Sequence, residues 1–103
     1  MEDTTKKKRR FLILGYGAVA RATIPVIVKE CKDRISEMVI IDMMKIDDKE
    51  AEKFLPIKTT FIQRKFGETN YGEQVVEYVK DDDVVCEFFG SVDSIGFIKA
   101  LKQ

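Results

Sequence analysis

Short apolar runs alternate along the chain with longer segments that are apolar on one side. Four of the runs are short enough to be strands, and the first two are unbroken, which is typical of strands covered on both faces by helices. The runs occupy residues 11–14, 38–41, 59–63 and 84–89. We therefore predict four strands separated by helical connections.

The segments after the first two runs carry helix signals. Residues 18–32 are apolar around much of a helical circumference, as expected for a helix packed against a sheet. Residues 47–55 contain Asp47 and Glu50 at the spacing of a capping pair, and Pro56 stops the helix from continuing. Both segments are predicted to be helical.

The last two connections also predict helices. Asn70 is a suitable N-cap for a helix after the third strand. Gly90 turns the chain into a last amphipathic segment. The apolar faces consist of Tyr71, Val75, Tyr78 and Val79 in the third helix and of Ile95, Ile98 and Leu101 in the last.

Strand and helix alternate from end to end, which argues for a parallel sheet with helices on both faces. We predict an α/β fold of the Rossmann type, with about four strands in the order 3-2-1-4. The third strand is then an edge, and residues 59–63 are indeed the most polar run. The fourth has the composition of an interior strand, so we expect a further segment or a second copy of the chain to pair with it, the latter giving a homo-oligomer.

The turn after the first strand carries a glycine pattern. Gly15, Gly17 and Ala20 match G-x-G-x-x-A directly between a strand and a helix. Gly15 permits the tight turn, Gly17 leaves room for a pyrophosphate, and Ala20 lets the helix approach the strand. Asp42 closes the second strand about 20 residues further on, where the dinucleotide-binding fingerprint has an acid. A plain strand-to-helix turn with a solvated Asp42 is the alternative.

Other residues complete the candidate site. Ala18 and Val19 supply N–H groups at the positive end of the helix, and Tyr16 is interpreted as packing within the turn. The loop after the fourth strand lies at the switch point of this fold, although helix capping explains that loop equally well. The candidate cofactor-binding residues are Gly15, Tyr16, Gly17, Ala18, Val19, Ala20, Asp42, Gly90 and Ser91.

The acid at the end of the second strand bears on the choice of cofactor. Asp42 can accept hydrogen bonds from both ribose hydroxyls and would repel a 2'-phosphate. This predicts NAD rather than NADP, although Lys45 follows closely and keeps NADP open.

Length and charge limit the classes of partner. A chain of 103 residues is one domain. Its 18 basic residues balance 18 acidic ones, so we expect no bulk attraction to nucleic acid or to a membrane surface. No apolar run approaches the roughly 18 residues of a membrane helix, and we expect a cytoplasmic location. Residues 1–10 are interpreted as a flexible basic leader and residues 11–103 as the NAD-binding domain.

Reactive side chains are few. The chain contains no histidine, which excludes Ser-His-Asp and Cys-His catalysis. Cys31 and Cys86 are not spaced as a CxxC pair. The run of Asp81, Asp82 and Asp83 is interpreted as a solvated turn, because three adjacent side chains make a poor metal site. We assign no catalytic residue and no metal ligand.

The sequence resembles the opening of homospermidine synthases. Residues 15–19 (GYGAV) and 23–26 (TIPV) are similar to the glycine turn of that family and its proline-containing helix. Residues 69–71 (TNY) resemble its helix start after the third strand. Residues 83–85 (DVV) and 91–94 (SVDS) resemble its fourth strand and the following turn.

This resemblance implies an enzyme that uses tightly held NAD to oxidise putrescine to an imine, transfers the aminobutyl group to a second diamine and reduces the product. The substrate pocket and catalytic groups of that family lie in a later domain, so a polyamine is expected as a partner only if such a domain is present. We accordingly interpret this chain as the amino-terminal part of a longer enzyme. Saccharopine dehydrogenase, similar in fold and motif, would imply an amino-acid substrate instead. A nucleotide sensor without turnover and a remnant that keeps only the fold are the remaining alternatives.

Overall fold

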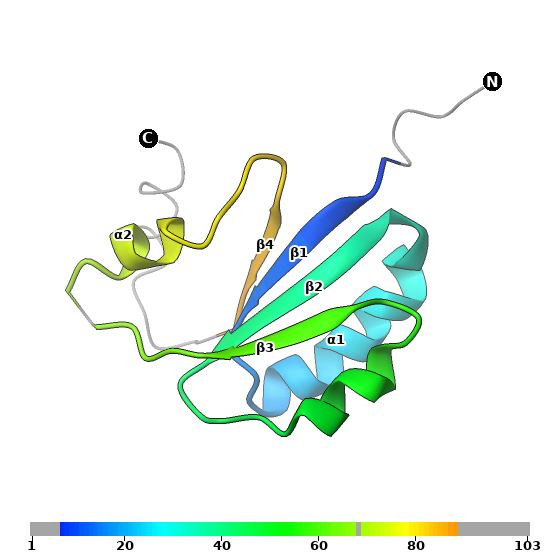
Figure 1. Cartoon of the computed structure of the whole chain (residues 1–103), viewed down its shortest axis with the longest axis horizontal. Helices are drawn as coiled ribbons and strands as arrows, with labels where there is room; N and C mark the ends of the chain where they lie inside the picture. The colour runs from blue at the N-terminus through cyan, green and yellow to red at the C-terminus, as the bar shows by residue number, and fades with distance from the viewer. Residues whose placement is uncertain (1–6, 68, 89–103) are drawn as a thin grey trace.

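A four-stranded parallel sheet forms the centre of the protein. The computed structural model describes residues 7–67 and 69–88. The strands are β1 (Arg9–Leu14), β2 (Ile35–Asp42), β3 (Thr59–Gln63) and β4 (Val84–Glu87), and their order in the sheet is β3-β2-β1-β4 (Figure 1). All three pairings are parallel. The predicted α/β fold and strand order are therefore confirmed.

Strand β1 is deeply buried because it has a strand on each side and cover on each face. Leu12, Ile13 and Leu14 have no exposed surface. In register, Leu14 lies opposite Ile41 of β2 and opposite Glu87 of β4. The carboxyl ends of these three strands thus meet at one edge of the sheet, where the segments that follow them come together.

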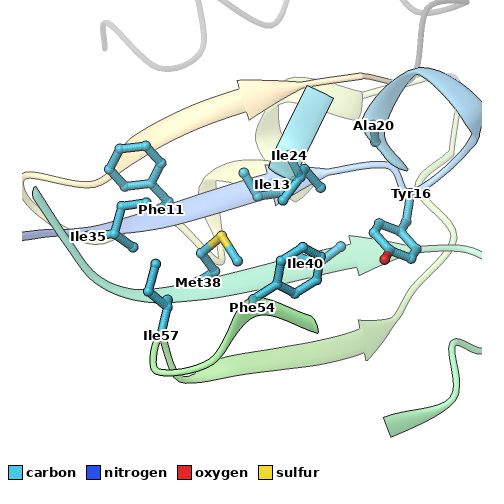
Figure 2. Packing of buried hydrophobic residues seen from close by; sticks show 10 residues of the cluster. All are labelled: Phe11, Ile13, Tyr16, Ala20, Ile24, Ile35, Met38, Ile40, Phe54 and Ile57. Atoms are coloured by element: carbon cyan, nitrogen blue, oxygen red, sulfur yellow. The ribbon is translucent and has the colours of Figure 1, made fainter. Parts of the chain in front are cut away.

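The two faces of the sheet are covered by different helices. Helix α1 (Ala18–Cys31), which continues through Pro25, and the 3-10 helix η3 (Asp48–Phe54) pack on one face, and a short 3-10 turn, η2 (Lys32–Arg34), joins α1 to β2. Helix α2 (Tyr71–Val76) packs on the other face through Tyr71 and Val75. Figure 2 shows the larger cluster, in which Tyr16 lies at one end of the row, beside the tips of the strands. The prediction of helices on both faces is confirmed.

The strand ends differ from the sequence prediction by a few residues. Strand β1 begins at Arg9 and β2 at Ile35, because these two residues already pair with each other at the amino edge of the sheet. Strand β3 is an edge, as predicted. Within the described residues, β4 pairs only with β1, so the expected pairing of its outer side with a second copy stays a prediction.

Two local predictions about helix starts need correction. Asp47 caps η3 by accepting the backbone N–H of Lys49, but η3 is a 3-10 helix, and the Glu50 side chain bonds Tyr16 and Lys53. Asn70 occupies the N-cap position of α2, as predicted, but it has a φ of 63° and its side chain makes no capping hydrogen bond. The turn before α2 is instead tied by Gln74, which accepts from the N–H of Gly67 and donates to the Thr69 carbonyl.

The acidic turn before β4 differs from the prediction at one residue, since Asp81 and Asp82 are exposed as expected. Asp83 is buried rather than solvated, with 2% of its side chain exposed. Its carboxylate accepts two hydrogen bonds from the Arg10 guanidinium, at 3.1 and 2.6 Å, and a third from the backbone N–H of Lys80 at 2.8 Å. Arg10 also donates to the Tyr78 carbonyl at 2.6 Å. These contacts join the start of β1 to the segment that leads into β4.

The predicted last segment, with Gly90, Ile95, Ile98 and Leu101, lies outside the described residues. Among the helices of residues 7–67 and 69–88, none is long and apolar enough to cross a membrane.

Candidate functional site

The chain turns sharply at Gly15, directly after β1. Gly15 has a φ of 99°, which side-chain-bearing residues rarely adopt, and it is buried. Its N–H donates to the carbonyl of Ile41 at 2.7 Å. The glycine therefore makes the tight turn that the pattern requires and ties this turn to the end of β2.

Gly17 lies at the N-cap of α1 and faces space that the described residues leave free. Its backbone is extended, with φ −89° and ψ −161°, so the conformation itself does not require glycine. A Cβ built on Gly17 would meet no described atom within 4 Å. In the part of the chain that the structure describes, no side chain caps α1 and no acidic residue lies in its first turn. The N–H groups at this helix start are thus accessible to an anion.

Of the three residues that follow Gly17, two are exposed to solvent and one is buried in the core. Ala18 and Val19 are exposed in the first turn of α1, and 66% of Val19 is accessible. Ala20 has no exposed surface, because it lies where the helix meets the sheet. Its small side chain permits the close approach expected for the third position of the glycine pattern.

Asp42 lies beside the glycine turn, at the end of β2. Its Oδ1 accepts the backbone N–H of Tyr16 at 2.9 Å, and its Oδ2 accepts the N–H of Met44 at 2.8 Å. Each carboxylate oxygen can accept more than one hydrogen bond, so Asp42 retains capacity for a ligand hydroxyl. The structure thus brings the acid and the glycine turn together.

Tyr16 packs inside the turn, as the sequence suggested, with 4% of its surface exposed. Its ring lies edge-on to Phe61, with 5.3 Å between the centroids, and the Arg21 guanidinium stacks 4.5 Å above it. Its hydroxyl donates to Glu50 Oε2 at 3.0 Å. Burial, and then the hydrogen bond to Glu50, raise the pKa of the Tyr16 phenol.

Sequence reasoning missed the contribution of Glu50 and Arg21. Glu50 accepts from Tyr16 and from Lys53 Nζ at 2.9 Å, and these two partners, Lys53 first, lower its pKa. Arg21 Nη1 lies 4.0 Å from the same carboxylate. Glu50 had been interpreted as part of a capping pair. The available signal was Tyr16 itself, because a buried tyrosine hydroxyl needs a hydrogen-bond partner.

The segment after Asp42 encloses a hollow lined by Lys45, Ile46, Asp47 and Asp48. Lys45 is exposed there. Gly90 and Ser91, the candidate residues after the fourth strand, lie outside the described residues, so their position relative to this site stays a prediction.

A comparison with protein families identifies the domain. The family model described as the saccharopine dehydrogenase NADP binding domain matches residues 11–101, which is most of the chain. The chain belongs to this family. Comparisons with curated proteins and with solved structures gave no significant match.

Membership of the saccharopine dehydrogenase NADP-binding domain family agrees with the Rossmann-type order of the strands. It supports the relationship to saccharopine dehydrogenase that the glycine turn and the strand pattern suggested. The narrower resemblance to homospermidine synthases is not distinguished by this match and is taken up below as a proposal.

The buried tyrosines give a prediction for alkaline pH. The phenols of Tyr16 and Tyr71 have pKa values raised by burial above the ordinary 10.0. Their protonated forms therefore contribute stability that is fully present below pH 10 and is lost as the pH rises through the folded-state values. A titration followed by phenolate absorbance should show phenols that ionise late, and Tyr16→Phe should remove one of them.

Urea unfolding at a series of alkaline pH values checks the same point. The wild-type protein should lose stability more steeply above pH 10 than Tyr16→Phe does. Parallel curves for the two proteins would contradict the raised pKa of Tyr16.

Proposed function

We propose that this domain binds a nicotinamide dinucleotide with its pyrophosphate against Gly17 and the first turn of α1. The observation that carries the proposal is the space in front of Gly17, which no atom of the described residues fills, at a helix start whose N–H groups are accessible. Family membership supports the same assignment. Gly15 shapes the turn, while Ala18 and Val19 present their backbone to the ligand.

We further propose that NAD is preferred over NADP, although the family is described by NADP binding. Asp42 lies 2.9 Å from the backbone nitrogen of Tyr16, at the position from which a carboxylate can accept the ribose hydroxyls. A 2'-phosphate at this place would be repelled by its negative charge. Lys45, in the segment that follows Asp42, is a cation that would favour NADP, but it is exposed, so solvent and salt screen its charge.

The cofactor preference can be tested by calorimetric titration of the chain with NAD and with NADP. Asp42→Ala should weaken NAD binding by about 1 to 3 kcal/mol, because ribose hydroxyls lose their acceptor. The substitution also removes the hydrogen bonds that Asp42 accepts from the backbone of Tyr16 and Met44. Their loss would weaken the binding of NAD and of NADP equally. The ratio of the two affinities isolates the ribose contact, and we expect it to shift toward NADP.

An unchanged ratio would contradict a ribose contact by Asp42, even if both affinities fell. Lys45→Ala is the matched variant, because it removes a charge from the same segment without touching the glycine turn. It should leave NAD binding nearly unchanged.

For the reaction, we propose a homospermidine synthase-like enzyme, in which this domain holds NAD for aminobutyl transfer from putrescine. The resemblance of residues 15–19 and 23–26 supports this choice. When bound, NAD would supply the reversible hydride transfer that this reaction requires. The residues of this chain bind and orient the cofactor, and none of them is assigned a catalytic role.

The principal alternative is a saccharopine dehydrogenase-like oxidoreductase, favoured by the family match. The two are separated by supplying the natural protein that carries this domain with NAD and either putrescine or saccharopine. Homospermidine, identified by mass, supports the synthase. Accumulation of NADH with saccharopine alone supports the dehydrogenase. Binding without turnover of either substrate supports a nucleotide sensor.

A further inference from the structure

Tyr16 is bonded to both ends of the segment that connects β2 to η3. Its backbone N–H donates to Asp42 Oδ1 at 2.9 Å, and its hydroxyl donates to Glu50 Oε2 at 3.0 Å. Asp42 is the last residue of β2, and Glu50 lies in the first turn of η3. One residue of the glycine turn therefore fixes residues 43–49 at their two ends.

We propose that Tyr16 and Glu50 form a positioning pair that holds residues 43–49 against the glycine turn and thereby sets the affinity for the adenosine half of the cofactor. This inference rests on the dinucleotide binding proposed above. Neither side chain needs to touch the ligand. The pair acts by fixing where Asp42 and the hollow formed by residues 45–48 lie relative to Gly17.

Ile46 is the one residue of this segment that packs against the core, and it is only half-buried. The rest of the segment buries little apolar surface and therefore depends on such polar contacts. Met43 and Met44 are 55% and 63% exposed. The described contacts of its first half are the bond from Met44 N–H to Asp42 and a long one, 3.3 Å, from Gln63 Nε2 to the Met43 carbonyl. Phe54 anchors η3 in the core, but it lies at the far end of that helix.

The charges around Glu50 hold the pair in one arrangement. Lys53 Nζ contacts the Glu50 carboxylate at 2.9 Å, and Arg21 Nη1 approaches it to 4.0 Å. Arg21 is itself held over the Tyr16 ring, and its Nε donates to the Tyr16 carbonyl at 3.3 Å. Tyr16 is thus restrained through its N–H, its carbonyl, its ring and its hydroxyl.

The test combines calorimetry and thermal unfolding of the 103-residue chain. Tyr16→Phe keeps the ring and deletes the hydroxyl, while Glu50→Ala deletes the acceptor. Each should weaken binding of NAD, and of 5'-AMP as a probe of the adenosine half, by about threefold to tenfold. The double variant should bind no more weakly than the worse single variant, because both substitutions remove the same hydrogen bond. Glu50→Gln, which keeps an acceptor oxygen, should recover part of the affinity.

Tyr78→Phe is the matched control, since it makes the same chemical change on the opposite face of the sheet. It should leave both ligands unaffected. A role in stability alone would lower the melting temperature of Tyr16→Phe and leave its dissociation constants unchanged well below that temperature. That result, or additive losses in the double variant, would overturn the positioning pair. If the wild-type chain binds neither NAD nor NADP, the proposed function fails and this inference fails with it.

Discussion

Replacing Gly17 with valine should abolish dinucleotide binding while the protein remains folded. The backbone at Gly17 is extended, and an added Cβ meets no described atom within 4 Å, so the fold can accept a side chain there. The space that valine fills is the space proposed for the pyrophosphate. We expect at least about a 100-fold loss of affinity for NAD in calorimetric titration, equivalent to roughly 2.7 kcal/mol.

Two further glycine variants make this result specific. Valine is a poorer N-cap than glycine by up to about 1 kcal/mol, whereas serine is a good one. Gly17→Ser should therefore keep the stability of the wild-type protein and still weaken binding. Gly15→Ala, in contrast, should lose about 1 to 2 kcal/mol of stability, because Gly15 has a φ of 99°. If Gly17→Val binds NAD as tightly as the wild-type protein does, the pyrophosphate does not lie at this turn.

Replacing Asp83 with alanine should cause the largest loss of stability among the polar substitutions. Arg10 and Asp83 are 15% and 2% exposed at their side chains, and the hydrogen bond to Asp83 raises the pKa of Arg10. Removing the carboxylate leaves a largely buried guanidinium without its counter-charge, which costs about 3 kcal/mol. We expect the midpoint of urea unfolding to fall by about 1 to 2 M.

An exposed ion pair nearby provides the control. Lys7 and Asp82 lie 3.2 Å apart, but their side chains are 65% and 60% exposed. Lys7→Ala should cost at most about 1 kcal/mol, because water and salt screen such a pair. The lysine is changed rather than Asp82, whose φ of 68° would add backbone strain to the comparison. Similar losses in Asp83→Ala and Lys7→Ala would show that burial does not strengthen the Arg10 contact.

The strand order could be predicted because it depends on features that repeat along the chain. Unbroken apolar runs at residues 11–14 and 38–41 indicate strands buried on both faces, and the polar run at 59–63 indicates an edge. Both conclusions hold in the sheet order β3-β2-β1-β4. The strand ends were less predictable, since Arg9 and Ile35 join the sheet through backbone pairing, which their side chains do not reveal.

The glycine turn was predictable for a similar reason. Gly15, Gly17 and Ala20 act through backbone conformation and small size, and these properties are visible in the residue type. The position of Asp42 beside the turn followed from the parallel sheet, which brings the ends of β1 and β2 to one edge. The sequence by itself therefore determined the fold class and the outline of the candidate site.

Only the tertiary structure decided how polar side chains that are distant in the sequence are paired. Arg10 belongs to a basic run and Asp83 to an acidic run, and both patterns predict solvated segments. The pairing of β1 with β4 nevertheless brings the two side chains together and buries most of their surface. Glu50 matched a capping pair, yet the packing of η3 beside the glycine turn makes it the partner of Tyr16. A charged side chain can satisfy its hydrogen bonds locally, with water or with a distant partner. Which of these three occurs depends on the groups that lie beside the side chain in the folded protein. A local sequence pattern does not contain this information.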